Sequence, residues 1–187
     1  MERPGPCDVR ASLADQACTL ALGLGANLPS PVGEPLATLV ALRPLLAAAL
    51  QQLWATWGEA PPVLQWSPLF RTAPVGGPPD QPDYLNAVLL VRGGGIPQER
   101  RALEVLVRLQ QLEGQFGRER REHWGPRSLD LDLLWWGSLE CSGEHLVLPH
   151  PLWRQRPFVL APLAVLQGVP LQPEWPQPLA GVPGWPE

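Results

Sequence analysis

The alternation of apolar and polar positions along the chain predicts four strands. Residues 18–25 and 84–92 are apolar runs of strand length, and 129–136 is strongly apolar without Gly or Pro, which is typical of a buried strand. Residues 63–72 predict a further strand. Pro68 within it indicates a sheet edge or a bulge, because proline cannot donate a hydrogen bond to a ladder.

Two longer segments, 34–54 and 97–114, repeat apolar residues at intervals of three and four and predict helices. Pro44 conflicts with the first pattern, so that helix either kinks there or begins later, with Pro44 in its first turn. Pro97 suits the first position of the second helix. The order strand, helix, two strands, helix, strand predicts a ferredoxin-like α+β fold, an antiparallel sheet with helices packed on one face.

Composition and charge narrow the class of protein. The chain has 187 residues, of which 45% are hydrophobic and 17% charged, and this suits one globular domain with a substantial core. The net charge of −4 argues against a nucleic-acid partner. No run of about 18 apolar residues and no signal-peptide pattern occurs, so we expect no membrane span and a cytoplasmic location. Three cysteines without metal-ligand spacing argue against a disulfide framework.

The two ends of the chain differ from the part between them. Residues 1–17 show no periodicity, and we expect a loose leader. Residues 167–187 form a tail rich in Pro and Trp, which we expect to be extended and draped on the surface.

Two acidic residues, Asp130 and Asp132, lie within the apolar strand 129–136. Alternate residues of a strand share a face, so both carboxylates project to one side, about 7 Å apart, and the neighbouring leucines project to the other. Such a pair is costly to bury without a neutralising partner. Mg²⁺ prefers a few carboxylate oxygens together with waters and phosphates, and Arg127 just upstream is a planar donor suited to phosphate.

A second interpretation places the acids at a solvated strand end, paired with guanidinium groups. The candidate partners are Arg118, Arg120 and Arg121. The apolar residues on both sides put the acids at the edge of a core instead, and this favours the metal site.

Tyr84 and Asn86 share one face of the strand 84–92, which follows a loop rich in Gly and Pro. An aromatic ring beside an amide suits a flat heterocycle that forms hydrogen bonds. A tyrosine packed in the core and an asparagine bonded to backbone would give the same pattern.

Three other features each carry two interpretations. The polar end of the helix 97–114, with Gln110 and Glu113, either lines a site or faces solvent. The charged run 116–127 has a glycine near each end and is either a solvated loop or a lid that closes over substrates. His150, which lies between two prolines, is either a capping residue or a ligand contact.

Gly23 and Gly25 resemble part of a dinucleotide-binding loop, but Leu28 stands where that motif has its third glycine, which argues against it. Asn27 after this strand is expected to be a turn or capping residue rather than a ligand contact.

Together and in this order, these blocks resemble the signature of the 6-hydroxymethyl-7,8-dihydropterin pyrophosphokinase family over about residues 18–166. The motifs that carry the resemblance are Gly25-Ala26-Asn27 after the first strand, the loop 71–86, the run 116–127 leading into Leu129-Asp130-Leu131-Asp132, and Pro149-His150 with Arg156 and Phe158 beyond. The resemblance implies a ferredoxin-like sheet with additional elements. It also implies transfer of pyrophosphate from ATP to the hydroxymethyl group of the dihydropterin in folate biosynthesis, with AMP released and two Mg²⁺ ions bound.

The resemblance also implies the roles of individual residues. The implied catalytic residues are Arg118, Arg127, Asp130 and Asp132, and the two aspartates are also the implied metal ligands. The implied ATP-binding residues are Gln110, Glu113, Arg120, Trp124, Arg127, His150 and Arg156. The implied pterin-binding residues are Thr72, Val75, Tyr84, Asn86, Trp124 and Phe158.

The chain departs from the family pattern at several positions. Ala26 replaces a serine, so a hydroxyl is absent after the first strand. Ala73 replaces a proline and the loop 71–86 is longer around 77–79, so the resemblance does not fix the exact course of this loop but leaves its role unchanged. His123 stands where many members have arginine, and we expect one phosphate contact to be weaker or pH-dependent there. Arg121 is a candidate to replace that contact.

Two other classes fit part of the pattern. One is a different Mg²⁺-dependent phosphotransferase, which would release ADP rather than AMP. The other is a non-catalytic ferredoxin-like module that binds nucleotide or RNA, and the negative net charge and paired aspartates argue against it. We expect a monomeric enzyme whose partners are its two small-molecule substrates.

Overall fold

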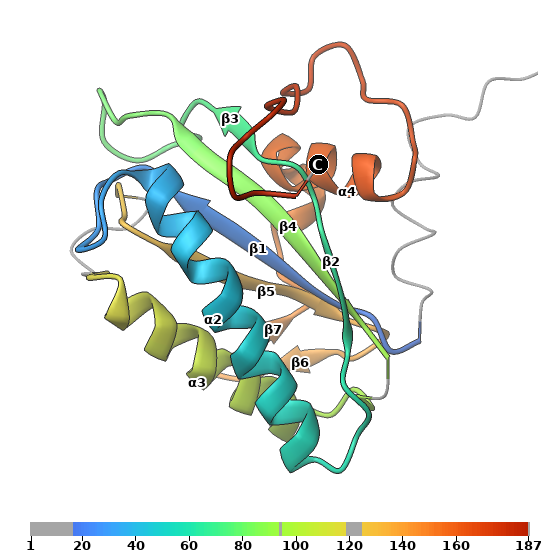
Figure 1. Ribbon diagram of the computed structural model, residues 1–187. Helices are drawn as coiled ribbons and strands as arrows, with labels where there is room; N and C mark the ends of the chain where they lie inside the picture. Colours follow the sequence, from blue (N-terminus) through green and yellow to red (C-terminus); the bar gives the residue numbers. More distant parts are fainter. Residues whose placement is uncertain (1–16, 94, 119–124, 187) are drawn as a thin grey trace, which may run out of the picture.

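The computed structural model describes residues 17–93, 95–118 and 125–186. A five-stranded antiparallel sheet lies at its centre (Figure 1). The strands are β1 (Leu20–Ala26), β2 (Val63–Trp66), β3 (Phe70–Thr72), β4 (Tyr84–Arg92) and β5 (Asp130–Trp136). Their order is β2-β4-β1-β5, and β3 also pairs with β4. The predicted α+β class and antiparallel sheet are confirmed.

Helices cover both faces of this sheet. On one face α2 (Pro35–Thr56) and α3 (Glu99–Gln115) lie side by side, and α4 (Pro157–Leu166) covers part of the opposite face (Figure 1). The larger core cluster lies under α2 and α3, and a smaller one lies under α4. The two predicted helices, α2 and α3, lie on one face as expected, whereas α4, which was not predicted from the sequence, lies on the other face.

Short elements complete the described chain beyond β5. The strands β6 (Cys141–Ser142) and β7 (Val147–Leu148) form a separate antiparallel pair. A 3₁₀ turn, η1 (Trp153–Gln155), precedes α4.

The starting residues of the two long helices differ from those that the prolines suggested. α2 begins at Pro35 and continues past Pro44, so a start at Pro44 is wrong. Pro44 is exposed, and the hydrogen bond that its ring removes is therefore lost near solvent rather than in the core. α3 begins at Glu99 after the N-cap Gln98, two residues later than a start at Pro97.

The predicted strand 63–72 is two strands, β2 and β3, joined by a break at Ser67–Leu69. Both pair with β4 at one edge of the sheet, as Pro68 indicated. Buried Ser67 fixes the break, because its N–H donates to Val88 O (2.9 Å) and its Oγ accepts from Val88 N–H (2.9 Å).

Strand β5 follows the predicted alternation. Leu129, Leu131 and Leu133 belong to the core cluster under α2 and α3, and the two acids face the other side. Asp130 pairs with Gly25 and Asp132 pairs with Gly23 of β1. A register shift beyond Leu133 then brings Leu134 and Trp135 together into the cluster under α4.

The C-terminal tail is only partly a surface segment. Most of 167–186 is exposed or half-buried, but Trp185 is 6% exposed and belongs to the larger core cluster. Its Nε1–H donates to Ser67 O at 2.9 Å, and the expectation of a tail draped on the surface is wrong at this residue.

Within the described part of the chain, α2 is the one helix long and apolar enough to span a membrane. Eight of its residues are buried against the sheet and α3, which is the pattern of a core helix.

Substitutions of Trp54 in α2 test how strongly this core packing stabilises the fold. Its side chain is fully buried, stacks on Trp136 with ring centroids 5.7 Å apart, and donates Nε1–H to Gly93 O at 2.9 Å. We expect Trp54→Ala to lower the free energy of unfolding by about 3–5 kcal/mol. Trp54→Phe should lower it by about 0.5–1.5 kcal/mol, because it removes one of the two hydrogen bonds that the Gly93 carbonyl accepts, the other coming from Gly95 N–H at 2.7 Å.

Urea denaturation followed by circular dichroism measures both changes. Gln52→Ala, at an exposed position of the same helix, is the control and should stay within about 0.5 kcal/mol of the wild type. A Trp54→Ala protein as stable as the wild type would show that this ring does not hold α2 on the sheet.

Candidate active site

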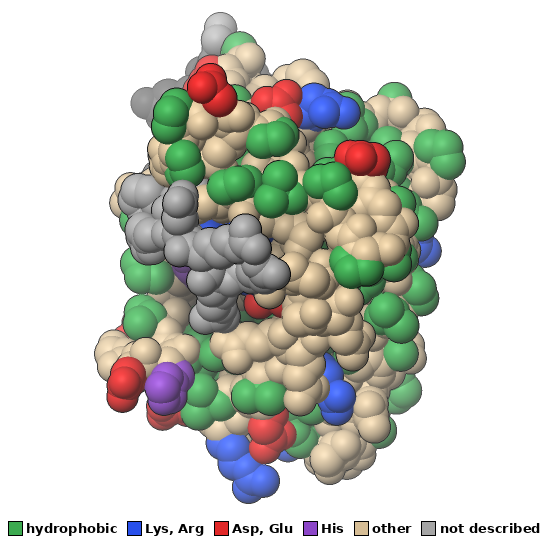
Figure 2. Space-filling model, turned by 90° about the vertical axis from the view of Figure 1, so that its left-hand side faces the viewer, with side chains coloured by type: hydrophobic (Ala, Val, Ile, Leu, Met, Phe, Trp, Pro, Cys, Tyr) green, Lys and Arg blue, Asp and Glu red, His purple; other side chains and the backbone are tan. Residues whose placement is uncertain are grey.

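A pocket of about 1160 Å³ opens at the end of the sheet where β1 ends and β4 and β5 begin. Figure 2 looks onto this side of the molecule, where acidic atoms are visible within a recess. The pocket lies on the sheet face opposite α2 and α3. The predicted site residues that line it are Thr72, Val75, Tyr84, Asn86, Arg118, Arg127, Asp130, Asp132, His150, Arg156 and Phe158.

Two of the residues predicted for ATP lie apart from this pocket. Gln110 is exposed and Glu113 is buried on α3, and both line a neighbouring recess of about 190 Å³ together with Arg118. Arg120 and Trp124, and with them Arg121 and His123, lie outside the described residues, so the predictions for them stay predictions.

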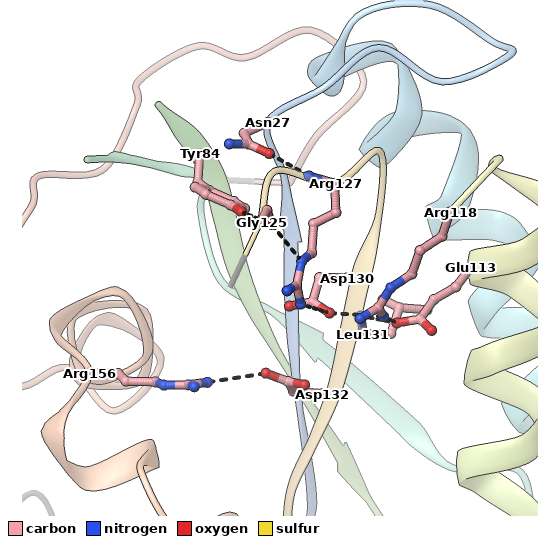
Figure 3. A network of polar contacts seen from close by, with 10 residues as sticks. All are labelled: Asn27, Tyr84, Glu113, Arg118, Gly125, Arg127, Asp130, Leu131, Asp132 and Arg156. Atoms are coloured by element: carbon pink, nitrogen blue, oxygen red, sulfur yellow. Dashed lines mark hydrogen bonds and ion pairs between the residues drawn. The ribbon is translucent and has the colours of Figure 1, made fainter. Parts of the chain in front are cut away.

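The two aspartates are neutralised by guanidinium groups that come from three directions (Figure 3). Asp130 Oδ1 is 2.9 Å from Nη1 of Arg118 and 2.9 Å from Nη1 of Arg127. Asp132 Oδ2 is 3.2 Å from Nη1 of Arg156. The ion pair between an aspartate and Arg118, one of those considered from the sequence, is present. The pairs with Arg127 and Arg156 were not predicted.

Glu113 holds Arg118 in this position. Its carboxylate accepts a hydrogen bond from Arg118 Nη1 and another from the backbone N–H of Leu131, at 2.8 Å (Figure 3). Glu113 is 3% exposed, and it ties the end of α3 to β5 beside Asp130. This contact was not anticipated, because the partner N–H lies 18 residues away in the chain.

Burial and the neighbouring charge of Asp130 raise the pKa of Asp132 to about 6, against the opposing effect of Arg156. The two carboxylates therefore interact strongly, as expected for like charges on one strand face. In the described part of the chain, Asp132 has one guanidinium partner and Asp130 has two. The structure thus places two interacting carboxylates among three guanidinium groups that balance their charge.

Asn27 was predicted to be a turn or capping residue and joins three segments. Its Oδ1 accepts from Arg127 N–H at 2.8 Å, its Nδ2–H donates to Pro82 O at 3.0 Å, and its own N–H donates to Arg127 O at 3.0 Å. It is 2% exposed. This side chain fixes the Arg127 backbone to the end of β1 (Figure 3), and it fixes the loop before β4 through Pro82.

The other side of the pocket has an amide and aromatic rings. Asn86 Nδ2–H donates to Thr72 Oγ1 at 2.7 Å, and the hydroxyl of Tyr84 donates to Gly125 O at 3.2 Å. Burial raises the pKa of Tyr84, so the hydroxyl stays a donor. Asn86 is satisfied by a side chain rather than by backbone, in contrast to the alternative weighed from the sequence.

Gly25 has a steric role beside this amide. A Cβ at this position would lie 2.8 Å from Asn86 Oδ1, closer than real contacts allow. The glycine that suggested a dinucleotide loop therefore makes room for a cross-strand side chain on β4.

His150 has the capping contact that was one of its two interpretations. Its Nδ1 accepts from the backbone N–H of Leu152 at 3.1 Å, and the ring also lines the pocket. Burial and the nearby Arg156 lower the pKa of His150, so the ring is neutral near pH 7 and its Nε2–H is a donor.

The comparisons with known proteins agree with this geometry. The model of the 7,8-dihydro-6-hydroxymethylpterin-pyrophosphokinase family matches residues 21–168. The chain belongs to this family. It is therefore an enzyme, an ATP-dependent pyrophosphokinase of folate biosynthesis.

Several curated relatives named 2-amino-4-hydroxy-6-hydroxymethyldihydropteridine pyrophosphokinase are similar over most of their length. The Synechocystis enzyme is 35% identical over 160 residues, which cover 86% of this chain and 69% of the relative. The Haemophilus influenzae enzyme is 36% identical over 145 residues, covering 78% and 79%. The Methylorubrum extorquens enzyme is 38% identical over 143 residues, covering 76% and 78%.

The raised pKa of Asp132 predicts a pH dependence of stability. The folded protein binds this proton more tightly than the unfolded chain does, so between about pH 4 and about pH 6 the free energy of unfolding falls as the pH rises. Asp132→Asn has no such proton to lose. Without divalent cations, we expect this variant to gain stability relative to the wild type as the pH increases through that range.

Chemical denaturation of both proteins at several pH values across this interval measures the effect. A difference in unfolding free energy that stays constant with pH would contradict the expectation.

Proposed function

We propose that the pocket holds ATP and 6-hydroxymethyl-7,8-dihydropterin side by side, and that pyrophosphate passes from ATP to the hydroxymethyl oxygen with release of AMP. One observation carries the proposal. Asp130 and Asp132 face the same cavity as three guanidinium groups, and an amide and aromatic rings line its other side. The names of the relatives indicate the same chemistry for those proteins.

The donor set supports Mg²⁺ at the two aspartates. Within the described ranges no group of three or more His, Cys, Asp or Glu side chains could hold a metal ion. Two neighbouring carboxylates that open into a phosphate-sized cavity suit Mg²⁺, which keeps waters and takes its other ligands from substrate phosphates. We assign Asp130 and Asp132 as ligands of two such ions. When bound, Mg²⁺ would neutralise phosphate charge and polarise the attacking hydroxyl.

The arginines supply the remaining positive charge. Displacement at the β-phosphorus spreads negative charge over the phosphate oxygens, so positioning and electrostatics dominate the catalysis. Arg118, Arg127 and Arg156 already point into the pocket at the aspartates (Figure 3), within reach of phosphates placed there. In this assignment Arg118 and Arg127 stabilise the developing charge, and Arg156 binds the ATP phosphates, as would Arg120.

The pterin occupies the other side of the pocket in this proposal. Asn86, held by Thr72, presents its amide to the edge of the heterocycle, and Tyr84 and Phe158 pack against its faces. Val75 is 68% exposed on the loop over this pocket, where an arriving ring would cover it. Trp124 is assigned to both substrates on the resemblance alone.

The adenosine end of ATP lies toward α3 in this arrangement. Gln110 lines the small recess next to Arg118, and Glu113 contributes by holding Arg118 there. His150 offers its Nε2–H from the opposite wall of the large pocket.

We further propose a cytoplasmic monomer that binds neither nucleic acid nor membrane. The net charge of −4 opposes binding to nucleic acid, and the apolar face of α2 is used within the core.

The reaction products test this function directly. Purified protein with ATP, Mg²⁺ and the dihydropterin alcohol should yield AMP and the pterin diphosphate in equal amounts, resolved by chromatography. Release of ADP instead would indicate a different phosphotransferase. Unchanged ATP would indicate a binding module without this activity.

The metal assignment predicts the effect of removing either carboxylate. We expect Asp130→Ala and Asp132→Ala each to lower turnover by several orders of magnitude while the circular dichroism spectrum stays native, because each change removes a ligand of Mg²⁺. Calorimetric titration of Mg²⁺ in the presence of a non-hydrolysable ATP analogue should show the loss of metal binding. Glu144→Ala, at an exposed position outside the pocket, is the control. Near-normal activity in either aspartate variant would refute the assignment.

A further inference from the structure

The tail 169–186, here called the strap, crosses the edge of the sheet. It lies beyond the family match, which ends at residue 168. Trp175 packs against the core cluster under α4, whereas Leu179, Val182 and Trp185 pack against the cluster under α2 and α3. The strap therefore passes from one face of the sheet to the other, around the edge formed by β3 (Figure 1).

The strap bonds to the break between β2 and β3. The N–H of Leu179 donates to Leu69 O at 2.7 Å, and Trp185 Nε1–H donates to Ser67 O at 2.9 Å. An isolated bridge also joins Phe70 of β3 to Pro178. The carbonyls of Ser67 and Leu69 thus bond to the strap, while the N–H and hydroxyl of Ser67 are bonded to β4 on the other side.

The far end of the strap is fixed on α2. Gly184 has a φ of +77°, and a Cβ there would lie 3.0 Å from Val40, so the turn requires glycine. Its carbonyl accepts from Arg43 Nη1 at 2.9 Å. This turn directs Trp185 into the core, edge-on to Trp66 with ring centroids 5.7 Å apart.

Strand β3 connects the strap to the pocket. It has three residues, and its ladder with β4 consists of three residue pairs. Its last residue, Thr72, accepts the hydrogen bond of Asn86 and lines the pocket. Three residue pairs fix the position of a strand only weakly, so contacts on the other side of β3 contribute much to its placement.

We propose that the strap is a positioning element for the pterin. By holding the break and β3 against β4, it keeps the Thr72 hydroxyl where it orients the Asn86 amide toward the ring. This inference rests on the proposed contact of Thr72 and Asn86 with the pterin. The acidic pair lies on β5, at the opposite edge of the sheet, so the strap favours binding of the pterin over binding of ATP.

A pair of variants in the full chain separates the backbone bond from side-chain packing. Leu179→Pro removes the N–H that reaches Leu69 O, and Leu179→Ala keeps it. We expect Leu179→Pro to raise KM for the dihydropterin about tenfold, roughly the value of one lost hydrogen bond, with KM for ATP changed by less than about twofold. Leu179→Ala and the exposed-site control Glu174→Ala should leave both KM values unchanged.

A merely structural role would give a different result. It would lower the thermal stability of Leu179→Pro and Leu179→Ala, with neither KM altered at temperatures where the proteins are folded. Unchanged KM for the dihydropterin in folded Leu179→Pro, or equal increases for both substrates, would overturn the proposal. If Leu179→Pro does not fold, Trp185→Phe removes the other strap bond and carries the same expectation, at about threefold.

Thr72→Val distinguishes this inference from the proposed function. If Thr72→Val leaves KM for the dihydropterin unchanged, the proposed pterin contact is wrong. If Thr72→Val raises it and Leu179→Pro does not, the strap inference alone is wrong. If both raise it, the double variant should resemble the more affected single variant, because both changes act through the same hydroxyl.

Discussion

The mutual repulsion of Asp130 and Asp132 is the constraint around which this end of the molecule is built. Two carboxylates on one strand face, at the edge of a core, require positive charge nearby. The flanking elements supply it: Arg118 follows α3, Arg127 precedes β5, and Arg156 precedes α4. The pocket is thus held in shape by ion pairs. In the proposed site, phosphates and cations would use the same groups, so that substrate binding would be an exchange of partners.

That exchange is uneven between the two aspartates. Asp130 lies between two guanidinium groups, one of which Glu113 also holds. Among the described residues Asp132 has one guanidinium partner, Arg156 at 3.2 Å, and its pKa is raised. Breaking a partly buried ion pair is costly unless a new partner arrives at the same time. In the proposed site, Asp132 would therefore be the carboxylate more readily given to an incoming cation, and Asp130 the one that keeps the arginines ordered.

The local sequence pattern was sufficient to predict much of this arrangement. Strict alternation in β5 placed both acids on one face and the leucines on the other, and an edge-strand proline located the break at Pro68. The features that could not be predicted from the sequence depend on tertiary contacts. α4 is apolar all round, so no periodicity shows which sheet face it covers. Glu113 meets a backbone N–H distant in sequence, and a lone Trp185 in a proline-rich tail carries no periodic signal for burial.

The strap also affects how the folded molecule meets other proteins. An uncovered edge strand offers a row of free carbonyl and amide groups, on which a strand from another chain can add. Here the carbonyls of Ser67 and Leu69 are already engaged from within the same chain. The stretch of this edge from Ser67 to Phe70 is thereby less available to a strand from another chain.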